Sequence, residues 1–250
     1  MNLLPSGKRF TQLSLPRDIT FGYGPKDLSA HLTKCFPTLS PMRIADIGAG
    51  SSLHAIELAR TFPRATVRAF EPSVDMQILS RENIAISKQK NIHFSDIGVE
   101  QVCTDYPSHF DLIHTCLIKY FIGSGSSFEK NIISSMAKNS IWICTDFFIP
   151  ENYSNSHRAV ALELMKKIFG FDIMNSDQFI NTVADFGLKL IDDSAVVKGE
   201  RANTSISEFS KLNDRRRYLL SEICRTKFLP EDFISLQGAM PLRTFVFVRE

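Results

Sequence analysis

The chain has 250 residues, of which 44% are hydrophobic and 22% charged, and its formal net charge is +2. A chain of this length and composition can bury one large globular core, and its small net charge disfavours a dedicated nucleic-acid-binding domain. The sequence contains no run of the roughly 18 apolar residues that a membrane-spanning helix needs. The first residues, MNLLPSGKRF, lack the apolar segment of a signal peptide. Five scattered cysteines without a Cys-x-x-Cys pair fit reduced thiols, so we expect a cytoplasmic protein.

Residues 1–40 are expected to form an N-terminal arm and a helix that opens at Pro25. From residue 41 to 150 the hydrophobic pattern alternates between short strands and helices. The expected strands are Arg43–Ile47, Ala65–Glu71, Asn91–Phe94, Phe110–Leu117 and Ile141–Phe148, and the expected helices are Leu53–Phe62, Ser73–Ser87 and Phe128–Ala137. This alternation is typical of parallel βαβ units, in which the loops after the strands meet at one ligand-binding edge.

Residues 151–250 follow a looser pattern. Helices are expected at Ala159–Phe169, Ser176–Phe186 and Ser205–Arg225, and closing strands at Leu188–Val197 and Leu242–Val248. The roughly 45 residues between those strands are too many for a hairpin, which indicates a helical insert. We therefore predict one α/β domain with a doubly wound, mostly parallel seven-stranded sheet, and helical cap elements in its C-terminal part.

The most informative segment joins a strand directly to a glycine turn. Residues Asp46–Ser52 have the sequence Asp-Ile-Gly-Ala-Gly-Ser-Ser. Glycine permits positive φ and a close approach of the backbone to a ligand, and the following helix offers free N–H groups. A dinucleotide site favours a small residue where this chain has Leu53, and Asp46 would repel a pyrophosphate. A cationic ligand explains Asp46 better.

Residues Asp46–Ser52 resemble motif I of the class I S-adenosylmethionine (SAM)-dependent methyltransferases, Asp/Glu-x-Gly-x-Gly-x-Gly, with Ser52 in place of the last glycine. Glu71–Met76 resemble motif II of the same superfamily, which begins with an acid at a strand tip. The resemblance implies a Rossmann-like fold in which Glu71 accepts hydrogen bonds from the ribose hydroxyls of SAM. It also implies that Met76 lies against the adenine.

Two weaker similarities follow along the chain. Asp96 comes after the third strand, where the superfamily has an acidic or polar residue that receives the adenine amino group. Phe110–Phe121 resembles the motif IV strand, and it offers His114 as a candidate general base and Tyr120 as a candidate aromatic residue beside the sulfonium. The cofactor-binding residues implied by these similarities are Asp46, Gly48, Ala49, Gly50, Glu71, Pro72, Met76, Asp96, Ile97 and Thr115.

The sequence thus predicts a methyltransferase that uses SAM and releases S-adenosylhomocysteine (SAH). The favoured acceptor is a small molecule, bound under a cap formed by residues 151–187 and 198–241. The alternatives are a methyltransferase for tRNA or another RNA that docks through Arg215–Arg217, a non-catalytic SAM- or SAH-binding protein, and, more distantly, a nicotinamide oxidoreductase. No metal site is expected, because none of the six histidines forms His-x-x-x-His or pairs with a cysteine at ligand spacing.

Overall fold

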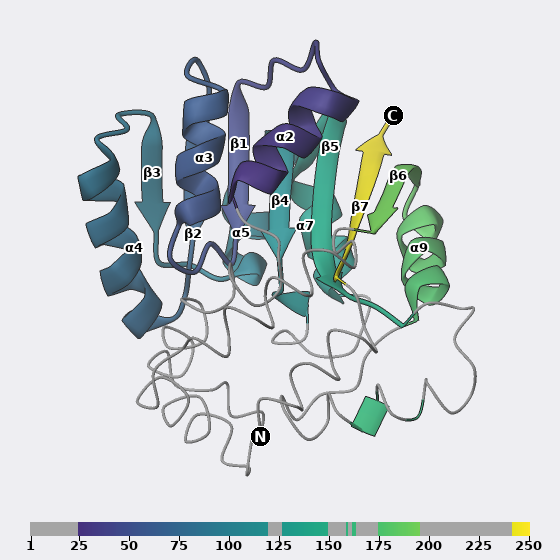
Figure 1. Cartoon of the computed structure of the whole chain (residues 1–250). Helices are drawn as coiled ribbons and strands as arrows, with labels where there is room; N and C mark the ends of the chain where they lie inside the picture. Colours follow the sequence, from purple (N-terminus) through teal and green to yellow (C-terminus); the bar gives the residue numbers. More distant parts are fainter. Residues whose placement is uncertain (1–24, 120–126, 150–158, 160–161, 164–174, 196–241) are drawn as a thin grey trace, which may run out of the picture.

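A central seven-stranded sheet with helices on both faces organises the protein (Figure 1). The computed structural model describes residues 25–119, 127–149, 159, 162–163, 175–195 and 242–250. The strand order is β3-β2-β1-β4-β5-β7-β6. Neighbouring strands are parallel except at β7, which runs antiparallel to both β5 and β6. The doubly wound, mostly parallel sheet expected from the sequence is therefore confirmed.

The strands and helices alternate along the chain through the first half of the fold. The strands are β1 (Arg43–Ile47), β2 (Thr66–Phe70), β3 (Ile92–Ser95), β4 (Phe110–Cys116), β5 (Met136–Phe147), β6 (Leu188–Ala195) and β7 (Leu242–Arg249). The helices are α2 (Pro25–Cys35), α3 (Leu53–Thr61), α4 (Val74–Ser87), α5 (Val99–Asp105), α7 (Ser127–Ser135) and α9 (Ser176–Asp185).

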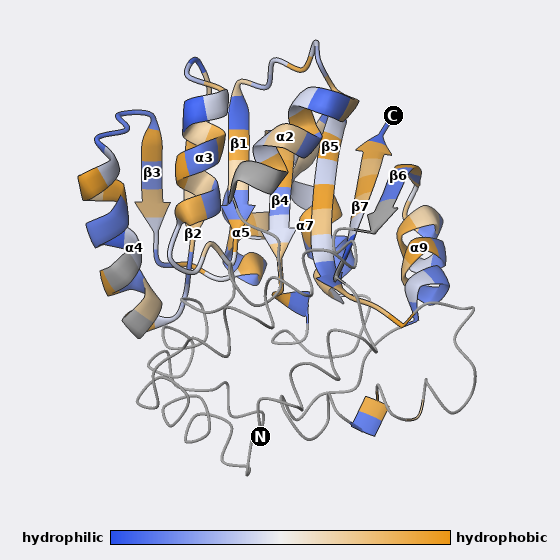
Figure 2. Cartoon of the chain, in the orientation of Figure 1, coloured by the Kyte–Doolittle hydropathy of each residue, from blue (hydrophilic) through white to orange (hydrophobic). Residues whose placement is uncertain are grey.

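The inner strands β1, β4 and β5 are buried along most of their length because helices cover both of their sides, and most of their residues are hydrophobic (Figure 2). On one face, Leu28 and Leu32 of α2 and Leu58 of α3 join a cluster of buried side chains from the strands. On the other face, α5, α7 and α9 contribute to a second cluster, which is rich in aromatic rings. Two separate cores therefore hold the sheet between them, and the carboxyl ends of β1 to β4 remain at one edge.

Two expectations about the elements were wrong. No helix was expected between β3 and β4, but Val99–Asp105 forms helix α5. Only Val99 and Val102 of this helix are buried, so its apolar pattern is too short to show a helical period. The helix expected to end at Ala137 ends at Ser135, and β5 begins at Met136 instead of Ile141. The exposed Lys138–Asn139 pair interrupts the apolar run, and the register between β4 and β5 shifts at this point.

The C-terminal part is described only in pieces. Helix α9 forms as expected, and its Phe179 contacts the rings of Trp142, Phe148 and Phe245. This helix therefore covers the sheet itself and does not extend away from it as a cap. The expected helix Ser205–Arg225 and the insert 198–241 lie outside the described residues, so the cap stays a prediction. In the part of the chain that the structure describes, we find no helix long and apolar enough to cross a bilayer.

Candidate functional site

The turn after β1 places two glycines in the left-handed region. Gly48 has φ +70° and Gly50 has φ +56°. The backbone N–H groups of Gly48 and Ala49 donate to the carbonyl oxygen of Phe70, each at 2.9 Å. A Cβ added to Gly48 would lie 2.3 Å from Cγ2 of Ile118. The turn thus crosses from β1 to β2 and packs against the chain after β4, and glycine is required at Gly48 for both reasons.

Ser52 shows how the chain tolerates its departure from the motif I pattern. Its φ is +60°, again in the left-handed region where the superfamily usually has glycine. The Ser52 hydroxyl is hydrogen-bonded to the hydroxyl of Ser80 on α4, and both side chains are buried. A non-glycine residue in this conformation costs about 1–2 kcal/mol. The hydrogen bond to Ser80 offsets part of that cost.

Glu71 connects the glycine turn to the start of α4. Its carboxylate follows the tip of β2 and is 7% exposed. Oε2 accepts a hydrogen bond from the Gly50 N–H at 2.8 Å, and Oε1 accepts one from the Ser73 N–H at 2.8 Å. Burial of a carboxylate is costly unless such donors surround it. Glu71 therefore fixes the relative positions of the two motif segments that the sequence identified.

The other residues predicted beside the cofactor differ in exposure. Met76 is 1% exposed, and its methyl carbon lies 3.3 Å from the position of a Cβ at Gly50, so it packs under the turn. Pro72 and Asp96 are exposed at the ends of β2 and β3, and Ile97 is partly buried against the α5 face. These residues gather at the carboxyl edge of the sheet, as parallel strands require.

Asp46 and His114 form a buried pair on the face covered by α3. Asp46 Oδ1 and His114 Nδ1 lie 2.8 Å apart, and the two side chains are 3% and 0% exposed. Within the described residues, Asp46 Oδ2 and His114 Nε2 have no hydrogen-bond partner. Native proteins rarely leave buried polar atoms unsatisfied. Two such atoms in one buried pair indicate a place where a ligand can complete the hydrogen bonding.

The polar side chains of Thr115, in β4, and of Lys119, just after it, lie on the opposite face of the sheet. Thr115 Oγ1 accepts a hydrogen bond from Trp142 Nε1 at 3.0 Å, so its hydroxyl satisfies the buried indole N–H of the core. Lys119 pairs with Glu129, and its ammonium lies 4.9 Å from the centre of the Phe179 ring. Burial lowers the pKa of Lys119 below its ordinary value, although nearby acidic groups such as Asp146 act in the opposite direction. Tyr120 lies outside the described residues, so its predicted role stays a prediction.

Sequence reasoning missed one residue at this edge. His54 lies in the first turn of α3, is 2% exposed, and has its ring centroid 4.9 Å from that of His114. It lies close behind the glycine turn. The available signal in the sequence was a polar residue on the inward face of an amphipathic helix. Local spacing of His and Cys residues along the sequence cannot reveal a neighbour that another element supplies.

Comparison with known proteins gives one curated match and many structural ones. No family model matches the chain. Methyltransferase str2 from Strobilurus tenacellus is 30% identical over 106 residues, which are 42% of this chain and 35% of that protein. The aligned part therefore spans about a third of the length of this curated relative.

Two solved structures illustrate the likeness in fold. Geranyl diphosphate C-methyltransferase from Streptomyces coelicolor, in complex with geranyl diphosphate and SAH, has a TM-score of 0.70 at 10% identity, over 90% of this chain and 79% of that one. The [4+2]-cyclase SpnF has a TM-score of 0.66 at 13% identity, over 89% of this chain and 79% of that one.

The strand order, with antiparallel β7 inserted between β5 and β6, distinguishes this chain from the parallel six-stranded dinucleotide-binding sheet. The protein has a Rossmann-like α/β fold. More particularly, it has the fold of the class I SAM-dependent methyltransferase superfamily, as the sequence resemblance predicted. A fold hosts more than one chemistry, and a cyclase among the neighbours illustrates this. Activity must therefore be argued from the site.

Proposed function

We propose that this protein binds SAM at the carboxyl edge of β1 to β4 and transfers its methyl group to a small-molecule acceptor, with release of SAH. The observation that carries the proposal is Glu71. It is a buried carboxylate at the tip of β2, hydrogen-bonded to the glycine turn through Gly50 and to α4 through Ser73. Asp46 adds a second buried carboxylate behind the same turn.

These two carboxylates fit the chemistry of SAM, and Asp46 opposes that of a phosphate ligand. SAM carries an ammonium and a sulfonium but no phosphate, whereas Asp46, behind the glycine turn, would repel a pyrophosphate. Glu71 suits the ribose of either cofactor. A carboxylate offers about four acceptor positions. Glu71 can therefore hold the Gly50 and Ser73 N–H groups and still accept hydrogen bonds from ribose hydroxyls. Asp46 Oδ2, which has no partner among the described residues, is suited to accept one from an ammonium.

The protein's contribution to catalysis would be positioning and exclusion of water. Bound SAM supplies a methyl carbon that its sulfonium makes electrophilic. The glycine turn lets the backbone approach closely, and Glu71 and Asp46 orient the two ends of the cofactor, which favours in-line attack by the acceptor. A general base is needed only if the acceptor loses a proton. His114 is fully buried with Nδ1 held by Asp46, so Nε2 would be its proton-accepting atom.

A small molecule remains the favoured acceptor. The structural neighbours include an enzyme named for geranyl diphosphate, and the curated relative is named a methyltransferase. The Arg215–Arg217 segment, on which the RNA alternative depends, lies outside the described residues. We also propose a cytoplasmic location, since scattered cysteines without a Cys-x-x-Cys pair fit reduced thiols.

Calorimetric titration with SAM, SAH and NAD tests cofactor binding. We expect SAM and SAH to bind and NAD not to bind. Glu71→Ala should weaken SAM binding at least about tenfold, because hydrogen bonds to a charged group contribute roughly 1.5–3 kcal/mol each. Glu82→Ala, which removes an exposed carboxylate from α4, is the matched control and should leave affinity unchanged. An unchanged dissociation constant for Glu71→Ala, or stabilisation by NAD alone, would contradict the proposal.

Methyl transfer needs its own test, because a non-catalytic SAM-binding protein would behave identically in the titration. The chain is incubated with methyl-labelled SAM and a cell extract, with and without ribonuclease. Label transferred to low-molecular-weight material in both samples is the expected outcome. Label in RNA that disappears after ribonuclease would establish the RNA alternative. Binding without transfer of label would indicate a sensor or scaffold.

A further inference from the structure

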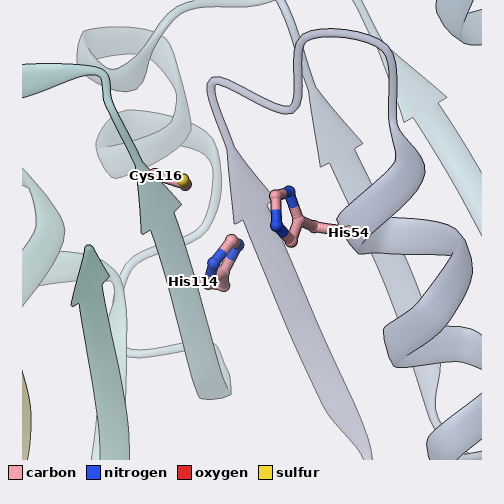
Figure 3. A group of neighbouring side chains, drawn as sticks. All are labelled: His54, His114 and Cys116. Atoms are coloured by element: carbon pink, nitrogen blue, oxygen red, sulfur yellow. The ribbon is translucent and has the colours of Figure 1, made fainter. Parts of the chain in front are cut away.

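Three side chains with metal-binding atoms meet on the α3 face of the sheet. His54 comes from α3, and His114 and Cys116 come from β4 (Figure 3). One ligand atom from each, an imidazole nitrogen or the thiol sulfur, lies within 4.8 Å of the others. The exposed fractions of the three residues are 2%, 0% and 4%. The cluster thus lies in the protein interior, behind the glycine turn.

The local structure explains why these residues converge. Alternate residues of a strand share a face, so His114 and Cys116 both point toward α3. His54 lies in the first turn of α3 and is turned inward toward β4 (Figure 3). Because α3 follows the glycine turn directly, the turn sets the position of His54 relative to β4. The sequence expectation of no metal site considered only residues close in sequence, and this cluster combines two elements.

A second observation points to a ligand at the cluster. His114 is fully buried, and its Nε2 has no hydrogen-bond partner among the described residues. Its other ring nitrogen, Nδ1, lies 2.8 Å from Asp46 Oδ1. Donation of Nδ1–H to that carboxylate leaves a lone pair on Nε2. Metal-binding histidines are commonly oriented in this way, with a carboxylate on the nitrogen that does not bind the metal.

We propose that His54, His114 and Cys116 bind one zinc-class divalent cation, and that Asp46 orients His114 for this role. Two imidazoles and a thiolate form a donor set suited to such an ion. Zinc lies about 2.0–2.3 Å from its ligands, so the ligand atoms of a tetrahedral site are roughly 3.5 Å apart. Side-chain rotations that move the ligand atoms by about 1 Å would bring the three atoms to this separation. As the sulfur–metal bond forms, the Cys116 thiol releases its proton to solvent.

The bound cation would join the start of α3 to the end of β4 and leave one coordination position open. This proposal does not depend on SAM binding, since none of the three ligands is needed for the cofactor contacts proposed above. A cation on Nε2 of His114 would exclude the role of general base for that residue, because the same lone pair cannot accept a proton. Asp46 belongs to both proposals, through Oδ1 toward His114 and through Oδ2 toward the cofactor. Metal binding is therefore measured without SAM.

Cobalt is the probe of choice because a thiolate ligand gives Co²⁺ a charge-transfer band in the near ultraviolet. Since the cluster is buried, the full chain is unfolded under reducing conditions and refolded with CoCl₂, and unbound metal is removed. We expect about one cobalt per chain by elemental analysis, the charge-transfer band, and loss of the band when ZnCl₂ is added. Refolded wild-type protein without bound cobalt, or with cobalt but no thiolate band, would overturn the proposal without reference to any variant.

Variants then assign the ligands. Cys116→Ser should abolish the thiolate band, His54→Gln should weaken cobalt binding at least tenfold, and Asp46→Asn should weaken it by about 10–100-fold, as other residues behind metal ligands do. Cys144→Ser is the matched control, because Cys144 is buried on the neighbouring strand and packs in the cluster on the opposite face. Cys35→Ser is a second control, since Cys35 lies near His31 and Asp192 in another group of possible ligands.

Both controls should keep the band. A band that survives Cys116→Ser, or that is lost in Cys35→Ser, would overturn the assignment to this cluster. Circular dichroism of each refolded variant shows whether a lost band accompanies a folded chain. If Cys116→Ser does not fold, titration of His54→Gln against wild type decides the question, and equal cobalt affinity of the two proteins would contradict the proposal.

Discussion

The two edges of the sheet are built differently. At the amino edge, Asp111 Oδ2 accepts hydrogen bonds from the backbone N–H groups of Met42 and Arg43, and Oδ1 pairs with the Arg43 guanidinium at 2.7 Å. The Asn91 amide donates to three carbonyl oxygens around the α3–β2 connection. Polar groups at this edge satisfy one another and join neighbouring segments. A hollow of about 340 Å³ also lies here, lined mainly by α2 and by the loops before β1 and β2.

At the carboxyl edge, buried polar atoms of the described residues lack partners and several residues of one turn adopt the left-handed conformation. Three residues of the turn after β1, Gly48, Gly50 and Ser52, have positive φ. Asp46 Oδ2 and His114 Nε2 are buried without hydrogen-bond partners among the described residues. Strained backbone and unsatisfied polar atoms typically mark functional sites, where a ligand supplies the missing interactions. We therefore infer that the amino edge stabilises the fold and that the carboxyl edge binds the ligand. Substitutions at each edge test this difference.

The largest effect is expected for Gly48→Ala. The added Cβ would lie 2.3 Å from Ile118 Cγ2, at a backbone φ of +70° that alanine disfavours. Crowding and the backbone cost together should lower the free energy of unfolding by roughly 2–5 kcal/mol, and SAM binding should be lost with the shape of the turn. Chemical denaturation and calorimetry measure the two quantities.

Gly187→Ala separates these two causes. Gly187 also has positive φ, +86°, but an added Cβ there would meet nothing within 4 Å. It should therefore show only the backbone cost, about 1–2 kcal/mol, with no change in SAM affinity. Equal destabilisation by both substitutions would mean that Ile118 yields easily and that the turn is less rigid than its packing indicates.

The sequence located the strand tips of the carboxyl edge correctly, and the cofactor-binding roles of the residues there stay predictions. Asp46, Gly50 and Glu71 each lie at or just after a strand tip, so a short pattern locates them. The sequence did not reveal interactions between residues of two different elements. His54 and Cys116 carry no local signature, and the pairing of Ser52 with Ser80 depends on how α4 packs against the turn. Helix α5 was missed because a helix with two buried residues has too short a period to recognise.

A smaller effect, confined to stability, is expected at the amino edge. Asp111→Asn removes the ion pair with Arg43 and weakens the hydrogen bonds to the backbone of Met42 and Arg43. The free energy of unfolding should fall by about 1–2 kcal/mol, a modest amount because the pair is partly exposed. SAM affinity should not change. Asp105→Asn, at an exposed aspartate on α5, is the control and should affect neither quantity. Weakened SAM binding in Asp111→Asn would show that the two edges are coupled.

The smallest expected effect is the pH dependence of that contribution. Burial alone would raise the pKa of Asp111, but the hydrogen bonds from Arg43 and Met42 prevail and hold its pKa below the ordinary value. Because the folded pKa lies below the unfolded one, the carboxylate stabilises the protein fully above the unfolded value of about 4. That contribution is lost as the pH falls through the folded pKa. The stability difference between wild type and Asp111→Asn should therefore be constant from pH 7 to about pH 5 and shrink toward pH 3. Urea denaturation at each pH measures it. A difference that stays constant down to pH 3 would mean that the charge of Asp111 contributes nothing and that only its shape matters at this edge.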